Sequence, residues 1–86
     1  MKQTEKILKA LANQRRLEIV RLLKKRRQAT VGEIAEAIDL SFRATSRHLG
    51  VLRSAEILDK KQQSLQVWYF ISDQSSSIAK AVIHLI

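Results

Sequence analysis

The side chains best suited to chemistry lie in one short stretch, residues 41–48. Two arginines, Arg43 and Arg47, are four residues apart, and Ser46 and His48 adjoin them. On a helix this spacing places both guanidinium groups on one face. Arginine pairs bidentately with guanine, and a serine hydroxyl donates or accepts at several base edges. The stretch therefore predicts a surface that reads bases or clamps phosphates of DNA.

Catalytic and metal-binding residues are scarce elsewhere in the chain. The sequence contains no cysteine and only two histidines, His48 and His84, which excludes disulfides and thiolate metal sites. It shows no Ser/His/Asp or Cys/His set, no phosphate-binding glycine loop and no metal-ligand pair. We expect a protein that is not an enzyme and that requires no metal and no cofactor.

The positive charge is unevenly distributed along the chain. The formal net charge is +8, and residues 1–61 hold 15 of the 16 basic and 7 of the 8 acidic side chains. Residues 62–86 hold one of each, Lys80 and Asp73, and are neutral and apolar. Cations that neutralise phosphates supply sequence-independent affinity for nucleic acid. A polyanion fits the basic part, although composition alone leaves open a generic solubilising surface or an anionic membrane surface.

Apolar spacing and polar capping residues predict two helices in the first third of the chain. The first spans about 5–12 after a Thr4 cap, and the second spans about 14–26 after an Asn13 cap. The second helix is apolar on most sides and is expected at the centre of the core. The basic run 24–27 either ends this helix, where cations complement the helix dipole, or contacts phosphates; the sequence leaves both open.

A helix-turn-helix is predicted next. The segment from Thr30 to Glu33 is typical of a capping box, and a third helix follows it with apolar residues at helical spacing. After a short turn at 39–40, Ser41 caps a fourth helix over about 42–55. Its inward residues are spaced i, i+4 and i+7: Thr45, Leu49 and Leu52. Two short helices joined by a tight turn after a central helix form the helix-turn-helix arrangement.

The apolar period changes from helical to alternating after residue 56. Residues 57–61 and 65–71 predict two strands joined by a turn, which is a wing. We expect the aromatic residues of the second strand, Trp68 and Tyr69, to pack the hairpin against the helices rather than to stack on single-stranded bases. A last helix over about 74–86 follows a cap at 72–73. The fold class is α+β, mainly α: a single winged helix-turn-helix domain over 1–86, in the order α-α-α-α-β-β-α.

Three segments carry a resemblance to a known family. They are Ile7 to Leu17, with its Ala-Leu-Ala step before Arg-Leu, Thr30 to Ala35, and Leu40 to Arg53 with Ser-Arg-His-Leu. These segments resemble the ArsR/SmtB family of winged-helix repressors, and the resemblance covers essentially the whole chain. Where family members often have glycine, this chain has Asp39, Glu56 and Ser64.

The resemblance implies that the helix after Ser41 enters the major groove of DNA. With Leu49 inside, a helical wheel turns Arg43, Ala44 and Arg47 outward and places Ser46 and His48 on the flanks. Phe42, which stands where the family commonly has a polar residue, either packs inward, seven residues before Leu49, or contacts a thymine methyl or sugar edge. The helix N-termini at Thr30 and Ser41 can receive phosphates. The wing is expected to reach the DNA backbone or minor groove through Lys60, Lys61, Gln62 and Gln63.

The first and last helices resemble the dimer interface of the family. The last helix has an apolar stripe of Ile78, Val82, Leu85 and Ile86, which an isolated chain of this size does not readily cover. We expect it to pair across a two-fold axis with Ile7, Leu8 and Leu11. The cysteine pairs and the Asp/His/Glu sites through which many family members sense metals have no counterpart here, and His84 stands alone on its helix.

The sequence thus predicts a sequence-specific double-stranded DNA-binding transcription regulator, a repressor that acts as a homodimer on a palindromic operator. Two alternatives stay open: a winged-helix protein-interaction module that docks an acidic partner, and an RNA-binding winged helix. No signal-peptide-like or membrane-spanning stretch is visible. We therefore expect a cytoplasmic, prokaryotic, nucleoid-associated protein with no membrane partner.

Overall fold

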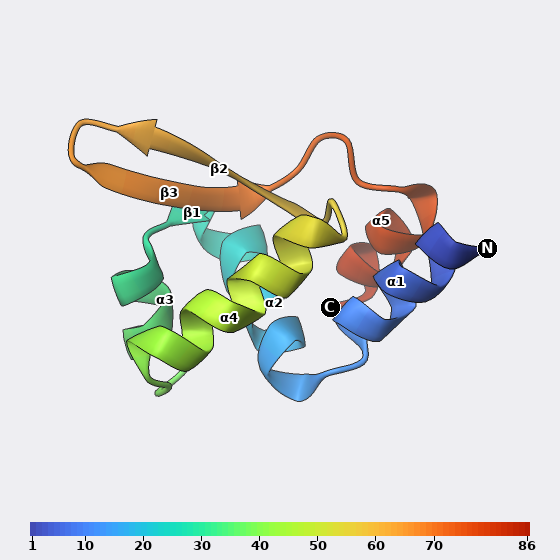
Figure 1. The fold of residues 1–86 in the computed structure, drawn as a ribbon, viewed down its shortest axis with the longest axis horizontal. Helices are drawn as coiled ribbons and strands as arrows, with labels where there is room; N and C mark the ends of the chain where they lie inside the picture. The colour runs from blue at the N-terminus through green and yellow to red at the C-terminus, as the bar shows by residue number, and fades with distance from the viewer.

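Five helices and a small antiparallel sheet make up the computed structural model, which describes residues 1–86 (Figure 1). The helices are α1 (Lys2–Leu11), α2 (Gln14–Arg26), α3 (Val31–Ala37), α4 (Phe42–Ser54) and α5 (Ser77–Leu85). The strands are β1 (Gln28–Ala29), β2 (Leu58–Gln63) and β3 (Gln66–Ile71), in the sheet order β1-β3-β2. A helix-turn-helix followed by a hairpin is the predicted winged helix fold, which is confirmed.

Three of the predicted helix caps are present with their hydrogen bonds. The Asn13 side chain accepts from the backbone N–H of Arg16 at 3.1 Å. Thr30 and Glu33 form the reciprocal capping box, at 3.2 Å and 3.0 Å. Ser41 Oγ accepts from the N–H of Ala44 at 3.0 Å. Each cap satisfies an amide that the helix itself leaves unpaired, so the starts of α2, α3 and α4 follow from local sequence.

The starts of α1 and α5 differ from those predicted. α1 begins at Lys2 with Met1 as its N-cap and without a side-chain cap, because Lys2 and Gln3 are good helix formers and carry the helix back past Thr4. α5 begins later, capped by Ser76, whose Oγ accepts from Ala79 N–H at 3.2 Å. Residues 72–75 form a turn instead, in which the buried Ser75 hydroxyl donates to the carbonyl of Ser72 at 2.7 Å.

The sheet contains a strand, β1, that the sequence does not predict. β1 is only two residues long and pairs with β3, with Gln28 opposite Phe70 and Ala29 opposite Tyr69. Two residues carry no alternating pattern, so only the pairing partner defines this strand. The turn of the wing is also shorter than predicted: β2 runs to Gln63, which pairs with Gln66, so two residues form the turn rather than the predicted three.

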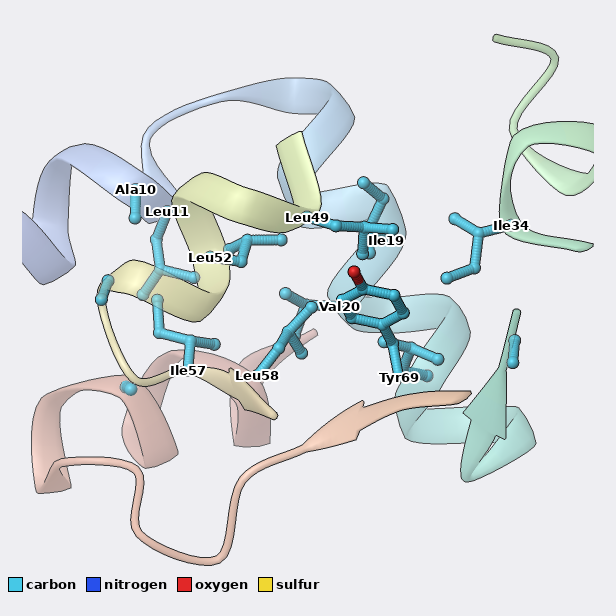
Figure 2. Close-up of a cluster of buried hydrophobic side chains, with 14 of the residues drawn as sticks. Ala10, Leu11, Ile19, Val20, Ile34, Leu49, Leu52, Ile57, Leu58 and Tyr69 are labelled. Atoms are coloured by element: carbon cyan, nitrogen blue, oxygen red, sulfur yellow. The ribbon is translucent and has the colours of Figure 1, made fainter. Parts of the chain in front are cut away.

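The core gathers around α2, as expected from its apolar residues on several sides. Ile19, Val20 and Leu23 are fully buried, and the inward residues of α4 are buried with them. Figure 2 shows side chains from α1, α2, α4 and β3 pointing into one shared space. Because one face of α4 is buried, its opposite face, which carries Arg43 and Arg47, is turned toward solvent.

Four residues other than glycine adopt positive φ angles. Three of them, Asp39, Glu56 and Ser64, are the positions at which family members often have glycine, with φ of 54°, 62° and 59°. The fourth is Arg27, with φ of 76°, at the end of α2. Asp tolerates a left-handed conformation better than Glu does, because its short side chain bonds the nearby backbone. These turns therefore hold residues with a Cβ in a left-handed conformation that favours glycine.

The helices and the hairpin are distributed along the long axis of the molecule, which extends 37 Å (Figure 1). The tip of the β2–β3 hairpin and α3 lie at one end, and α1 and α5 lie at the other. None of the helices has the length and apolar character needed to cross a membrane.

Candidate nucleic-acid interface

The outer face of α4 presents the predicted cationic group. Arg43, Ser46 and Arg47 are exposed, and Ala44 and His48 are half-buried at the flanks. On the opposite face Leu49 is completely buried. The structure therefore places Arg43 and Arg47 on the outer face and His48 at its flank, as the helical wheel predicts, whereas Ala44 lies at the flank and Ser46 on the exposed face.

Phe42 does not pack inward, so that alternative is wrong. Its side chain is 62% exposed at the first residue of α4. Seven residues correspond to about 10 Å along a helix, which places Phe42 past the end of the core although it shares a face with Leu49. It lines a groove of about 430 Å³ beside α3 and the wing, together with Thr30 and Lys60.

The capping hydroxyls at the two helix starts belong to Thr30, which lines this groove, and to Ser41, which precedes Phe42. Thr30 is half-buried and Ser41 is exposed. Each oxygen already accepts a backbone N–H, which leaves the hydroxyl hydrogen able to donate. Both residues can therefore cap their helix and donate to a phosphate at the same time.

The predicted wing residues all lie on β2 and are all exposed: Lys60, Lys61, Gln62 and Gln63. Lys60 Nζ lies 6.0 Å from the ring centroid of Tyr69, and Lys61 Nζ lies 5.7 Å from that of Phe70. Contacts at this distance between an ammonium and a ring face are attractive. Tyr69 itself is buried and Trp68 half-buried, so the aromatic residues pack the hairpin and support the lysines.

The basic run at the end of α2 divides into two parts. Lys24 Nζ donates to the carbonyls of Ile83 and His84 at 2.9 Å and 3.3 Å, and so satisfies the C-terminal end of α5. Lys25, Arg26 and Arg27 are exposed. Lys24 therefore serves the fold, while the other three cations remain available to solvent.

Arg16 is a residue of this region that the sequence prediction missed. From the first turn of α2, its Nε donates to the carbonyl of Ala10 at 2.6 Å and its Nη2 to that of Lys9 at 3.1 Å. Its Nη1 lies 3.2 Å from Nδ1 of His48 on α4. A signal was present: α2 has arginines and no acidic residue in its first turn, against the preference of a helix N-terminus.

The residues predicted for a dimer interface occupy two environments. Ile7 and Leu11 are 3% and 4% exposed and belong to the chain's own core, so the expectation that they form an intersubunit surface fails for these two. They face inward because α1 packs on α5, α2 and α4. Leu8 and Leu85 are 49% and 81% exposed. Ile78, Val82 and Ile86 are half-buried against the core.

No group of three histidine, aspartate or glutamate side chains comes close enough to hold a metal ion. The site is instead a cationic helix face beside a cationic hairpin, carried by a helix-turn-helix. This combination defines the class of winged helix-turn-helix DNA-binding domains.

Comparison with known proteins gives the family. The sequence model described as "Bacterial regulatory protein, arsR family" matches residues 13–60. The chain belongs to the ArsR family of bacterial transcription regulators. It is a DNA-binding transcription regulator, in a family of regulators and not of enzymes.

Two curated relatives illustrate the range of the family. The transcriptional activator HlyU of Vibrio cholerae is 36% identical over 80 residues, which cover 93% of this chain and 70% of that protein. The arsenical resistance operon repressor of Bacillus subtilis is 30% identical over 74 residues, which cover 86% of this chain and 70% of that protein. This chain is thus similar both to an activator and to a repressor.

Solved structures share the fold over nearly the whole chain. HlyU from Vibrio cholerae superposes with a TM-score of 0.82 at 35% identity, covering 96% of this chain and 86% of that chain. The homodimeric winged helix-turn-helix domain of Mb0332 from Mycobacterium bovis gives a TM-score of 0.84 at 27% identity, covering 98% of this chain and 74% of that chain.

Proposed function

We propose that this regulator is a homodimeric repressor that binds a palindromic operator through α4 and the wing. The observation that carries the proposal is the two-sided character of α4. Arg43 and Arg47 project from its outer face, while the burial of Leu49 and Leu52 prevents the helix from rotating. A fixed helix can present the same side chains to the same base pairs each time it binds.

The wing and the helix caps support this docking. Lys60 of the wing lines one groove with Phe42 at the start of α4, whereas Lys61, the next residue of the strand, lies on the other face of the hairpin, beside α2 and α5 (Figure 1). Thr30 and Ser41 offer hydroxyl donors at the starts of α3 and α4. In such an arrangement α4 reads base edges, and the caps and wing fix its register through the phosphates.

Two further observations support a symmetric pair. Leu8 and Leu85 are exposed apolar side chains on α1 and α5, two elements in mutual contact, and a contiguous apolar patch marks an interface. The similar domain of Mb0332 is homodimeric. A two-fold pair presents two α4 helices and so requires half-sites about one helical turn apart.

Repression as the direction of regulation is supported by two similar proteins. The Bacillus subtilis relative and the structurally similar PagR of Bacillus anthracis are both described as repressors. A promoter fusion expressed with and without the protein measures the direction directly, and higher expression in its presence would make it an activator.

Selection of bound sites from a random duplex library, followed by fluorescence anisotropy, tests DNA recognition. The selected site should be a palindrome, and binding should weaken steeply with salt. Arg43→Ala and Arg47→Ala should each weaken operator binding by about 10- to 100-fold and relax the base preference at one position of each half-site. Lys80→Ala, which removes an exposed cation of α5, is the matched control and should bind normally.

Three outcomes would contradict the proposal. Equal affinity for duplex RNA would favour an RNA-binding protein. Failure to enrich any duplex sequence, with capture of an acidic protein instead, would favour an interaction module. An asymmetric selected site would remove the palindromic operator while leaving DNA binding in place.

A further inference from the structure

We infer that the cleft between α1 and α4 binds a backbone phosphate of the operator, so that α1 is part of the DNA-binding surface. This inference rests on the proposed function and extends it to residues outside the helix-turn-helix and wing. The cleft has a volume of about 570 Å³. Four cationic residues and no acidic one line it, mainly through the aliphatic parts of their side chains, so that the charged ends lie at its rim: Lys6, Lys9, Arg16 and Arg47.

The two walls are regular helix faces. On α4 the lining residues Arg47, Gly50, Val51 and Ser54 are spaced i, i+3, i+4 and i+7, which forms one stripe. On α1, Lys6, Lys9 and Ala10 form the corresponding stripe. Arg47 belongs both to this stripe and to the exposed face with Arg43. The cleft is therefore continuous with the surface proposed to enter the major groove.

The charge in the cleft is only weakly compensated. The one carboxylate that pairs with a lysine of the cleft is that of Glu5, whose Oε2 lies 3.8 Å from Lys9 Nζ in a largely exposed pair. Pairs of this kind contribute little to stability and are readily exchanged. Lys6 and Arg47 have no acidic partner. A phosphate at the rim of the cleft between α1 and α4 therefore meets cations whose charges are not already neutralised.

His48 lies beside the same arginines. It is half-buried on α4, and its pKa is lowered by burial first and then by the charges of Arg16, Arg47 and Arg15. Three guanidinium groups that disfavour a further positive charge at this place favour a negative one. The Arg16 guanidinium is held in place by the carbonyls of Lys9 and Ala10, so its charge stays beside the cleft.

Gly50 supplies the third observation. It lies in the interior of α4, where glycine destabilises a helix by about 1 kcal/mol relative to alanine. Its φ is not positive, and a Cβ there would meet no atom within 4 Å. Neither backbone conformation nor packing requires a glycine. Glycine on this wall allows a phosphate oxygen to approach the α4 backbone closely.

The test is the salt dependence of Lys6→Gln/Lys9→Gln, measured by anisotropy on the selected operator and on a scrambled duplex. Each phosphate contact contributes about 0.9 to the slope of log K against log salt, which corresponds to roughly fivefold in affinity per contact at about 0.15 M salt. In the double variant the slope should be smaller by the contribution of this one contact, and the affinity should fall by the same factor on both duplexes. Lys2→Gln/Lys80→Gln removes the same charge from exposed residues outside the cleft and should keep the wild-type slope.

Glu5→Gln provides a test with the opposite sign. It releases Lys9 from its carboxylate and should steepen the slope and tighten binding, whereas Asp73→Asn, with the same charge change on an exposed residue outside the cleft, should not. Phosphate ethylation interference should identify a phosphate whose modification weakens the wild-type protein but not Lys6→Gln/Lys9→Gln.

The possible failures are distinguishable. If the wild-type protein binds no duplex, the proposed function falls. If it binds and the double variant retains its slope and its ethylation pattern, the cleft does not bind phosphate and the proposed function stands. A double variant that changes base preference without changing the slope also overturns the inference, because a phosphate contact is indifferent to sequence.

Discussion

Nη1 of Arg16 lies 3.2 Å from Nδ1 of His48, so a side chain of α2 joins the end of α1 to the outer helix α4. A guanidinium only donates hydrogen bonds, and Nδ1 must therefore accept, with the proton of neutral His48 on Nε2. This contact holds three helices in one arrangement and fixes which nitrogen of His48 carries hydrogen. It depends on His48 remaining neutral.

The free energy of unfolding should therefore depend on pH through His48. Its native pKa lies below the ordinary value of 6.5 because of burial and the charges of Arg16, Arg47 and Arg15. As the pH falls from about 6.5, the unfolded chain takes up a proton before the native chain does, so the stability contributed by neutral His48 is lost as the pH passes down through the native pKa. Urea unfolding at several pH values between 5 and 8 measures how the free energy of unfolding changes with pH. His48→Gln should remove this part of the slope, and an unchanged slope in His48→Gln would assign it to other groups.

Arg16→Met should lower the free energy of unfolding by about 1–3 kcal/mol, because it leaves the carbonyls of Lys9 and Ala10 and the His48 ring without a charged donor. Arg16→Lys should recover only part of this loss, since one ammonium cannot reproduce three directed bonds. Denaturant titration gives both values. Arg21→Met, at an exposed position of the same helix, should change stability by less than about 0.5 kcal/mol; if it costs as much as Arg16→Met, the effect belongs to net charge.

Thr45→Val should stabilise the protein. Thr45 is fully buried on α4, and its Oγ1 has no hydrogen-bond partner. A buried hydroxyl without a partner costs about 1–3 kcal/mol, and valine has nearly the same shape. We expect a gain of about 1 kcal/mol, which raises Tm by roughly 4–8 °C in a domain of this size. Thr45→Ala should lower Tm, because it also removes a packed methyl group. A lower Tm for Thr45→Val would show that the hydroxyl is satisfied.

Glu56→Gly should also stabilise the protein, by about 0.5–1 kcal/mol. The φ of Glu56 is 62°, a conformation that costs a residue with a Cβ about 1–2 kcal/mol. Glycine avoids this cost, but it loses more conformational entropy on folding, which reduces the net stabilisation. Glu56→Ala keeps the Cβ and should change little. Thermal unfolding of the two variants separates backbone strain from loss of the carboxylate, and an equal gain in both would point to the carboxylate.

Leu85→Asp should produce monomers if α5 contributes to a homodimer. Leu85 is 81% exposed, so the charge does not disturb the core of the single chain and acts only on an interface. Light scattering should give the mass of one chain for Leu85→Asp, with the circular dichroism of the wild type. Leu65→Asp, at the exposed wing tip, should remain dimeric. A dimer that survives Leu85→Asp would place the interface elsewhere.

Most of the helix-turn-helix was predictable because its signals are local. Asn13, Thr30 and Ser41 each bond an amide within three residues, and the spacing of Thr45, Leu49 and Leu52 defines the inner face of α4. The outward placement of Arg43 and Arg47 follows from that spacing by helix geometry. Such relationships span one or two helical turns, and they hold whatever the rest of the chain does.

Other features depend on partners distant in sequence. β1 exists because β3 lies beside it, Phe42 is exposed because the core ends before the first turn of α4, and Ile7 and Leu11 are buried because α1 packs on three other helices. Helical spacing shows which residues share a face, but not what covers that face.

The sequence by itself determined the class of protein and the cationic face of α4. The tertiary structure alone decided that Arg16 meets His48, that Lys6 and Lys9 face Arg47 across a cleft, and that only part of the apolar surface of α1 and α5 remains exposed. The physical reason is distance along the chain. Helix caps and helix faces are set by neighbours within a few residues, whereas contacts between helices are set by the packing of the whole core.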